Sequence, residues 1–108
     1  MGRHLLLEVY DIKYDLLNDV SSLKSIVHSG IIRSRMNILN TYTHQFTPHG
    51  LTILVCLSES HVSIHTFPEN NCVSVDAYTC GDGNPKIIIL ELLKYFDSYN
   101  YTLREIYR

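Results

Sequence analysis

Residues 51–79 read LTILVCLSESHVSIHTFPENNCVSVDAYT, and this stretch decides the fold. It contains three runs of β-branched, leucine and aromatic residues, at Leu51–Leu57, Val62–Phe67 and Val73–Thr79, which is typical of strands. The first run is almost continuously apolar, as in a central strand. Residues 68–71 supply the turn that joins the last two runs. The stretch therefore predicts three neighbouring strands of one sheet.

Strand patterns also lie on both sides of this stretch. RHLLLEVY at Arg3–Tyr10 and YTLREIY at Tyr101–Tyr107 predict the first and last strands. Side chains alternate in NILNTYTHQF, Asn37–Phe46, before residues 47–50 turn the chain into the next strand. The alternation predicts one mainly apolar face, made of Ile38, Asn40, Tyr42, His44 and Phe46.

Two segments have the period of amphipathic helices. From Tyr14, apolar residues recur at steps of three and four, which predicts a helix over residues 14–29 with a cap at Gly30, although the apolar stripe continues beyond it. A second helix begins after Asn84, the candidate N-cap, with Pro85 in the first helical position. This order predicts an α+β fold, a two-layer α/β sandwich with a largely antiparallel sheet and two helices packed on one face.

Composition limits the class of protein. The chain has 108 residues, 45% of them hydrophobic and 19% charged, which is typical of a single globular domain, here residues 1–108. The net charge of −2 and the lack of a Lys/Arg run argue against a nucleic-acid partner. No apolar run approaches the ~20 residues that cross a bilayer, so we expect no membrane partner and a cytoplasmic location. Cys56, Cys72 and Cys80 lack Cys-x-x-Cys spacing, so we expect reduced thiols and no metal site.

The densest group of polar residues lies at Ser58–Glu69. Alternation places Ser60 on one face of the predicted strand, and His61 and His65 on the other. Each residue alone has an ordinary structural role, because a serine at a strand start commonly serves a turn and a histidine on a strand commonly packs. Together, a hydroxyl, two imidazoles and a carboxylate are the groups that nucleophilic and general acid–base catalysis use.

A longer pattern surrounds this group. The segment HQFTPHGLTILVCLSESHVSIHTFPE, residues 44–69, followed by VSVDAYTCGDGNP, residues 73–85, resembles the bacterial and archaeal S-adenosylmethionine decarboxylases. The signature is Glu59-Ser60-His61-x-x-x-His65-Thr66-x-Pro68-Glu69, with Val75-Asp76-x-x-Thr79-Cys80-Gly81 at the usual distance. Members of this family are pyruvoyl-dependent lyases that supply the aminopropyl donor for spermidine biosynthesis. The resemblance spans the whole chain and implies the same activity here.

The resemblance also implies a proenzyme that cleaves itself. The Ser60 hydroxyl would attack the carbonyl of Glu59, turn the amide into an ester, and then eliminate. Cleavage of the Glu59–Ser60 bond would give a β chain of residues 1–59 and an α chain of residues 60–108. Ser60 would become the pyruvoyl cofactor, the electron sink that decarboxylation of an amino acid requires.

Further roles follow from the resemblance. His65 is implied as the base that takes the Ser60 α-proton, and Thr52, where serine is usual, as the hydroxyl that steadies the acyl shift. The amino group of S-adenosylmethionine would form a Schiff base with the pyruvoyl group, and Cys80 would return the proton as general acid. Phe46 is implied to stack on adenine and Glu69 to bind the ribose hydroxyls. Two further matching residues are expected only to support the site: His61 and Asp76.

Two alternatives stay open. Paralogues with the same self-cleaving core decarboxylate arginine or ornithine, and the presence of both Phe46 and Glu69 favours the nucleoside substrate over these. An unprocessed, non-enzymatic binding homologue would keep Ser60 intact. The chain departs from the family at His49, where glutamine is usual, which concerns the substrate loop rather than the cleavage chemistry.

We also expect a homodimer of αβ protomers. Two helices cover only one face of the predicted sheet, and apolar strand residues such as Tyr42, Val55 and Ile64 suggest that the other face meets a partner. The resemblance adds that active sites form near such an interface, with residues from both protomers.

Overall fold

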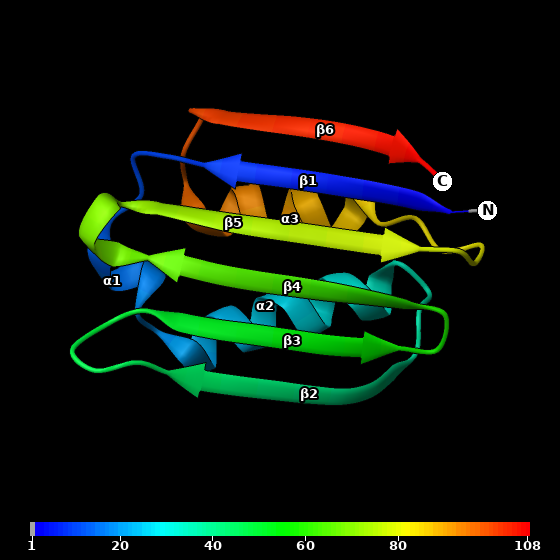
Figure 1. Ribbon diagram of the computed structural model, residues 1–108, viewed down its shortest axis with the longest axis horizontal. Helices are drawn as coiled ribbons and strands as arrows, with labels where there is room; N and C mark the ends of the chain where they lie inside the picture. The colour runs from blue at the N-terminus through cyan, green and yellow to red at the C-terminus, as the bar shows by residue number, and fades with distance from the viewer. Residues whose placement is uncertain (1) are drawn as a thin grey trace.

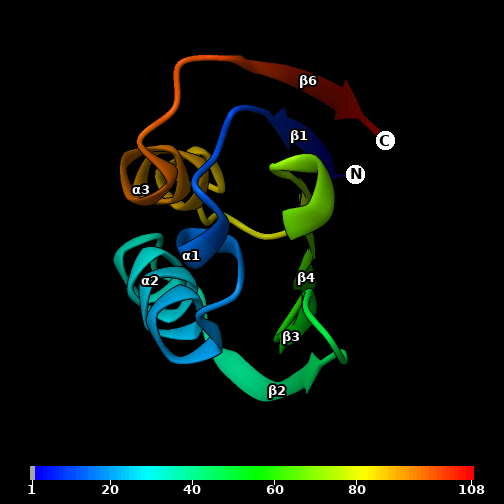
Figure 2. The same ribbon diagram turned by 90° about the vertical axis from the view of Figure 1, so that its left-hand side faces the viewer.

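The computed structural model describes residues 2–108 as a two-layer α+β sandwich. One six-stranded antiparallel sheet has the strand order β2-β3-β4-β5-β1-β6, and the helices pack on one of its faces (Figures 1 and 2). The elements are β1 (Arg3–Val9), α1 (Tyr14–Leu17), α2 (Val20–Arg33), β2 (Ile38–Gln45), β3 (Leu51–Leu57), β4 (Ser60–Phe67), a 3-10 turn (Pro68–Asn70), β5 (Cys72–Thr79), α3 (Lys86–Phe96) and β6 (Tyr101–Tyr107). The predicted fold class is confirmed.

Every predicted strand is present. The bounds of β3 and β6 are those predicted, and β4 begins at Ser60, two residues before the predicted start at Val62. Side chains that point from the strands into the helix layer form a continuous apolar core with α2 and α3. Its strand residues include Leu5, Leu7, Val9, Leu51, Ile53, Val55, Val62, Ile64, Val73, Val75 and Ala77.

The predicted helix over residues 14–29 is wrong in two respects. It is divided into α1 and α2, because Asp19 has extended backbone and caps α2, where its carboxylate accepts the Ser22 N–H at 3.1 Å. Helix α2 also continues to Arg33. Gly30 does not end it but lies where α2 meets α3, and a Cβ there would stand 3.1 Å from the Cα of Ile88. The glycine therefore serves close helix packing rather than a cap.

The predicted apolar face of the Asn37–Phe46 strand is also wrong. The pairing of β2 with β3 is irregular between Ile38 and Asn40, and the less exposed side chains along the following residues are those of Thr41 and Thr43. Thr41 contacts α2, since its Oγ1 lies 2.8 Å from Nε2 of His28. Tyr42 is 58% exposed on the opposite face. The polar side of this edge strand therefore faces the helices.

Helix α3 begins one residue later than predicted, but Asn84 still caps it. The helix begins at Lys86, with Pro85 in the N-cap position. The Asn84 side chain still accepts the Lys86 N–H at 3.1 Å, which is the bond that a capping residue makes.

The sheet face opposite the helices is open within the chain (Figure 2). The prediction that Val55 and Ile64 lie on it is wrong, because both are core residues, 1% and 0% exposed. Alternation places Leu54 and Phe67 on this open face together with many polar side chains of β1, β3, β4 and β5. The polar residues include His4, Thr52, His61, Ser63, His65, Ser74 and Asp76. Within residues 2–108, no helix is long and apolar enough to cross a membrane.

Candidate active site

The Glu59–Ser60 peptide bond lies where the β3–β4 hairpin enters β4. Ser60 is half-buried and pairs with Thr79 of β5. The Ser60 hydroxyl donates to Oγ1 of Thr79 at 2.8 Å, and the same oxygen accepts the Gly81 N–H at 3.2 Å. Thr79 is 2% exposed, so a buried side chain holds the Ser60 hydroxyl in place.

The carbonyl of Glu59 is held by Cys80. The Cys80 N–H donates to the Glu59 oxygen at 3.3 Å, and the Cys80 thiol donates to it at 2.7 Å. Two donors on one carbonyl oxygen polarise it and stabilise negative charge that develops there. The sheet thus brings Cys80 to the peptide bond that the Ser60 hydroxyl would attack.

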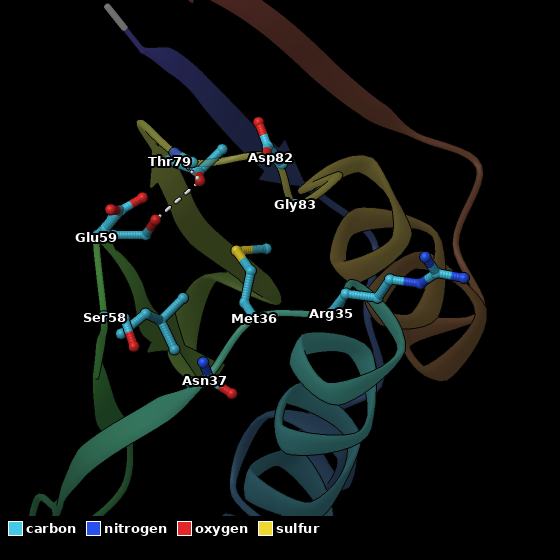
Figure 3. A pocket seen from close by; sticks show the side chains of 11 residues that line it. Arg35, Met36, Asn37, Ser58, Glu59, Thr79, Asp82 and Gly83 are labelled. Carbon is cyan, nitrogen blue, oxygen red and sulfur yellow. Dashed lines mark hydrogen bonds between the residues drawn. The ribbon is translucent and has the colours of Figure 1, made fainter.

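A small cavity of about 240 Å³ adjoins this peptide bond. Figure 3 shows Met36 reaching into it from the α2–β2 connection, with Glu59 and Thr79 on the strand side. Arg35 and Asn37 flank Met36 at the rim. Sequence reasoning missed these three residues, because nothing in the α2–β2 connection signals that it folds against a hairpin more than twenty residues away.

The remaining candidate residues gather at the opposite end of the sheet. Thr52 Oγ1 and His65 Nδ1 lie 3.0 Å apart in a hydrogen bond. Glu69 pairs with His49, with 2.8 Å between Oε2 and Nε2. The Phe46 ring is 51% exposed, and these five residues line a cavity of about 260 Å³. All of the residues that the resemblance implies for nucleoside binding, and the implied elimination base, therefore lie at this end of the sheet.

The two groups are separate within one chain. Ser60 shares the core-facing side of β4 with Val62 and Ile64, whereas His65 is on the open face. At about 3.4 Å per residue, the five steps from residue 60 to residue 65 span roughly 17 Å. His65 therefore lies beyond hydrogen-bond reach of Ser60 in the same chain. The structure joins Ser60, Glu59 and Cys80 in one group, and Thr52, His65, Phe46 and Glu69 in another.

Asp76 lies on the open face between these groups, paired with Ser63 in the β4–β5 ladder. Burial raises the pKa of Asp76, but hydrogen bonds from Ser63, His4 and His61 outweigh this effect and hold the pKa below its ordinary value. Asp76 is therefore an ionised carboxylate at neutral pH.

The fold and the hairpin define an α+β protein with a candidate self-cleaving peptide bond. A family model described as "S-adenosylmethionine decarboxylase" matches residues 3–108, so the chain belongs to this family.

Relatives and solved structures agree with that assignment. The chain is 43% identical over 94 residues to the S-adenosylmethionine decarboxylase proenzyme of Prochlorococcus marinus (strain MIT 9313), covering 87% of this chain and 75% of that protein. It is 38% identical over 109 residues to the proenzyme of the same name from Synechococcus sp. (strain WH7803), covering 100% and 85%. It covers a smaller share, 65%, of the S-adenosylmethionine decarboxylase proenzyme 2 of Bacillus anthracis, at 43% identity over 81 residues.

Among solved structures, the adenosylmethionine decarboxylase of Aquifex aeolicus superposes with a TM-score of 0.90 at 26% identity, covering 100% of this chain and 90% of that one. The Trypanosoma brucei AdoMetDC-delta26 monomer superposes with a TM-score of 0.69 at 16% identity, covering 94% of this chain and 44% of that one. The second match shows the shared fold alone.

Proposed function

We propose that this chain is a proenzyme that cleaves itself between Glu59 and Ser60 and then decarboxylates S-adenosylmethionine. Membership of the S-adenosylmethionine decarboxylase family and the names of its relatives support this substrate over arginine or ornithine. The observation that carries the proposal is the hydrogen-bonded group at the hairpin, where the Ser60 hydroxyl is held by Thr79 and the Glu59 carbonyl receives two donors from Cys80.

This geometry suits an N-to-O acyl shift. The Ser60 oxygen attacks the carbonyl carbon of Glu59, and the charge that develops on the carbonyl oxygen is stabilised by the N–H and thiol of Cys80. The C–N bond then breaks, which leaves an ester of Glu59 on the Ser60 oxygen and a free amino group on Ser60. A base removes the Ser60 α-proton, the Glu59 carboxylate leaves, and hydrolysis of the resulting dehydroalanine releases ammonia and forms the pyruvoyl group.

The pyruvoyl group that this chain would make supplies an electrophilic carbonyl that accepts the electrons of the departing carboxylate. The residues around Ser60 fit such a group. The Cys80 thiol lies 2.7 Å from the Glu59 carbonyl oxygen, next to Ser60. It would therefore stand beside the pyruvoyl group and could return a proton to the former α-carbon of the substrate.

The base and the substrate-binding residues are proposed to come from a second copy of the chain. His65 and Thr52 lie on the open sheet face, far from Ser60 of their own chain, and the helices leave that face free. A homodimer that pairs open faces would let the Phe46, Glu69 and His65 end of one protomer approach the Ser60 end of its partner. Each site would then need both copies.

Co-expression of two defective chains tests this arrangement. A Ser60→Ala chain lacks the nucleophile, and a His65→Ala chain lacks the base. If sites are shared, the His65→Ala chain should be cleaved when it is co-expressed with the Ser60→Ala chain, because the latter supplies His65. No increase in cleavage over the His65→Ala chain alone, in a mixture shown to contain mixed dimers, would refute the shared site.

Intact mass spectrometry of the purified wild-type protein tests the cleavage itself. We expect fragments of residues 1–59 and 60–108, the second carrying the mass of a pyruvoyl group in place of its first serine. A wild-type chain that stays whole after long incubation would overturn the proposal and support an unprocessed binding homologue.

A further inference from the structure

Three side chains from three strands converge on the open face, away from both groups described above. His4 of β1 and His61 of β4 lie on either side of Asp76 of β5. Nε2 of His4 is 2.7 Å from Oδ2 of Asp76, and Nε2 of His61 is 3.1 Å from the same oxygen. Within residues 2–108, this is the one group of at least three His, Cys, Asp or Glu residues whose ligand atoms all lie within 4.8 Å of one another.

The strand register explains the convergence. His4 and His61 both pair with Tyr78 of β5, and Asp76 lies two residues before Tyr78 on the same face of that strand. The Tyr78 ring packs against both imidazoles, at centroid distances of 5.5 Å and 5.9 Å. The two rings are therefore fixed by the tyrosine with their Nε2 atoms directed to the Asp76 carboxylate.

The carboxylate is itself oriented. The Ser63 hydroxyl donates to Oδ1 of Asp76, which leaves Oδ2 to the two histidines. Proteins commonly orient metal ligands in this way, through a hydrogen bond to the atom that does not bind the metal. His4 and Asp76 are mostly buried, with side-chain exposures of 18% and 23%, whereas His61 is more open at 47%. Within a single chain, the group is thus ordered and open to solvent at His61.

We propose that His4, His61 and Asp76 form a binding site for a divalent transition-metal ion, for which Zn²⁺ is the best match. Two imidazole nitrogens and one carboxylate oxygen are a donor set that Zn²⁺ prefers, with a fourth position left open for water. Metal–ligand distances of about 2.0–2.1 Å in a tetrahedral site place the ligand atoms roughly 3.4 Å apart. The observed Oδ2–Nε2 distances of 2.7 Å for His4 and 3.1 Å for His61 would both lengthen to this spacing when the ion replaces the two hydrogen bonds.

This site was absent from the sequence expectation because the ligands form no short motif. His4, His61 and Asp76 come from distant parts of the chain, and the expectation of no metal rested on the spacing of the cysteines. His61 and Asp76 also match the family signature, but none of the three ligands is part of the Ser60, Glu59 and Cys80 group or of the Thr52 and His65 group. Zinc titration and chain cleavage therefore give separate readouts for the metal site and for the proposed function.

Calorimetric titration of the full, chelator-treated chain with ZnCl₂ tests the site, and the visible absorption of bound Co²⁺ reports the ligands. We expect one ion per chain with micromolar or tighter affinity. Asp76→Asn, which keeps the size of the side chain, and His61→Gln should each weaken binding by at least about ten-fold and change the Co²⁺ spectrum. The control is His28→Gln, which removes an imidazole on the helix side of the sheet, and it should bind like wild type.

His61→Gln keeps the experiment decisive if Asp76→Asn does not fold, because His61 is the most exposed of the ligands. Absence of saturable binding by the wild-type chain would show that His4, His61 and Asp76 form a hydrogen-bonded network only. Wild-type affinity in both ligand variants would place the ion elsewhere, for example at His49 and Glu69. Either result would overturn the proposal.

Discussion

The Ser60 end and the His65 end of β4 hold two separate groups of polar side chains. At the first end, the half-buried hydroxyl, the Glu59 carbonyl and Cys80 are joined by hydrogen bonds, but no imidazole is part of this group. At the second end, His65 is hydrogen-bonded to Thr52 on the open face beside the exposed Phe46 ring, and the Glu59–Ser60 peptide bond lies at the other end of the strand. Under the proposed function, one strand would supply a nucleophile and a base that do not meet within one chain. The difference between the two ends then teaches that activity would require a second copy of the chain.

The largest effect is expected from removing the nucleophile at the first end. Ser60→Ala should fold and remain a single full-length chain with no decarboxylase activity, because no oxygen remains to begin the acyl shift. Intact mass and release of carbon dioxide from carboxyl-labelled S-adenosylmethionine measure the two outcomes. Activity in this variant would refute the pyruvoyl mechanism and the role of Ser60 as its nucleophile.

Removing the base at the second end should stop the reaction later. His65→Ala should slow cleavage by about 100-fold or more, since general-base catalysis contributes on this scale, and should accumulate the ester. Hydroxylamine, which cleaves esters, should then release the two fragments. If hydroxylamine leaves the variant whole, no ester has formed. His65 would then act in the acyl shift rather than in the elimination.

Substrate-binding variants at the second end should spare self-cleavage. Glu69→Gln removes the charge from hydrogen bonds to the ribose hydroxyls, and such charge-assisted bonds are worth about 1.5–3 kcal/mol, so we expect the Michaelis constant to rise roughly ten- to a hundred-fold. Phe46→Ala should act similarly through lost stacking, worth about 1–3 kcal/mol.

His49 gives this experiment a matched control. Because His49 holds the Glu69 carboxylate at 2.8 Å, His49→Gln frees that carboxylate without removing it and should raise the Michaelis constant far less than Glu69→Gln. Steady-state kinetics separate the cases. The assignment of a nucleoside substrate would be wrong if the Phe46 and Glu69 variants kept full activity on arginine or ornithine and the wild-type chain did not turn over S-adenosylmethionine.

A smaller effect is expected from the residue that positions the nucleophile. Thr79→Val keeps the shape of the side chain but leaves the Ser60 hydroxyl without its partner, and one hydrogen bond of about 0.5–1.5 kcal/mol corresponds to cleavage slowed roughly two- to ten-fold. Thr79→Ser restores the acceptor and should recover the rate, which time courses of chain cleavage can measure. Equal rates in both variants would mean that the orientation of Ser60 does not depend on Thr79.

The smallest effect concerns the carboxylate between the two ends. Asp76 has a lowered pKa in the folded chain, so it contributes stability that is fully present above its unfolded pKa of about 3.9 and is lost as the pH falls through the lower folded pKa. Lowering the pH from 7 to 3 should therefore lower the unfolding temperature of the wild-type chain more steeply than that of Asp76→Asn, which thermal unfolding at a series of pH values can measure. Parallel curves would show that Asp76 gains no net stabilisation from its partners.

Local patterns in the sequence are sufficient for most elements. Alternation and β-type composition locate all of the strands, and they place Ser60 and His65 on opposite faces of one strand. The predicted helix over residues 14–29 fails because the capping bond of Asp19 and the close approach of Gly30 to α3 depend on neighbours that the apolar period does not report. The predicted β2 face fails because a pairing irregularity changes which side chains meet the helices.

The family signature and the alternation of β4 were therefore determined by the sequence alone, because both are properties of residues close together in the chain. Only the tertiary structure brought Cys80 to the Glu59 carbonyl and gathered His4, His61 and Asp76 on one face. The physical reason is strand register. Which side chains meet across a sheet depends on how distant segments pair, and that pairing is set by burial of the whole core rather than by any local pattern.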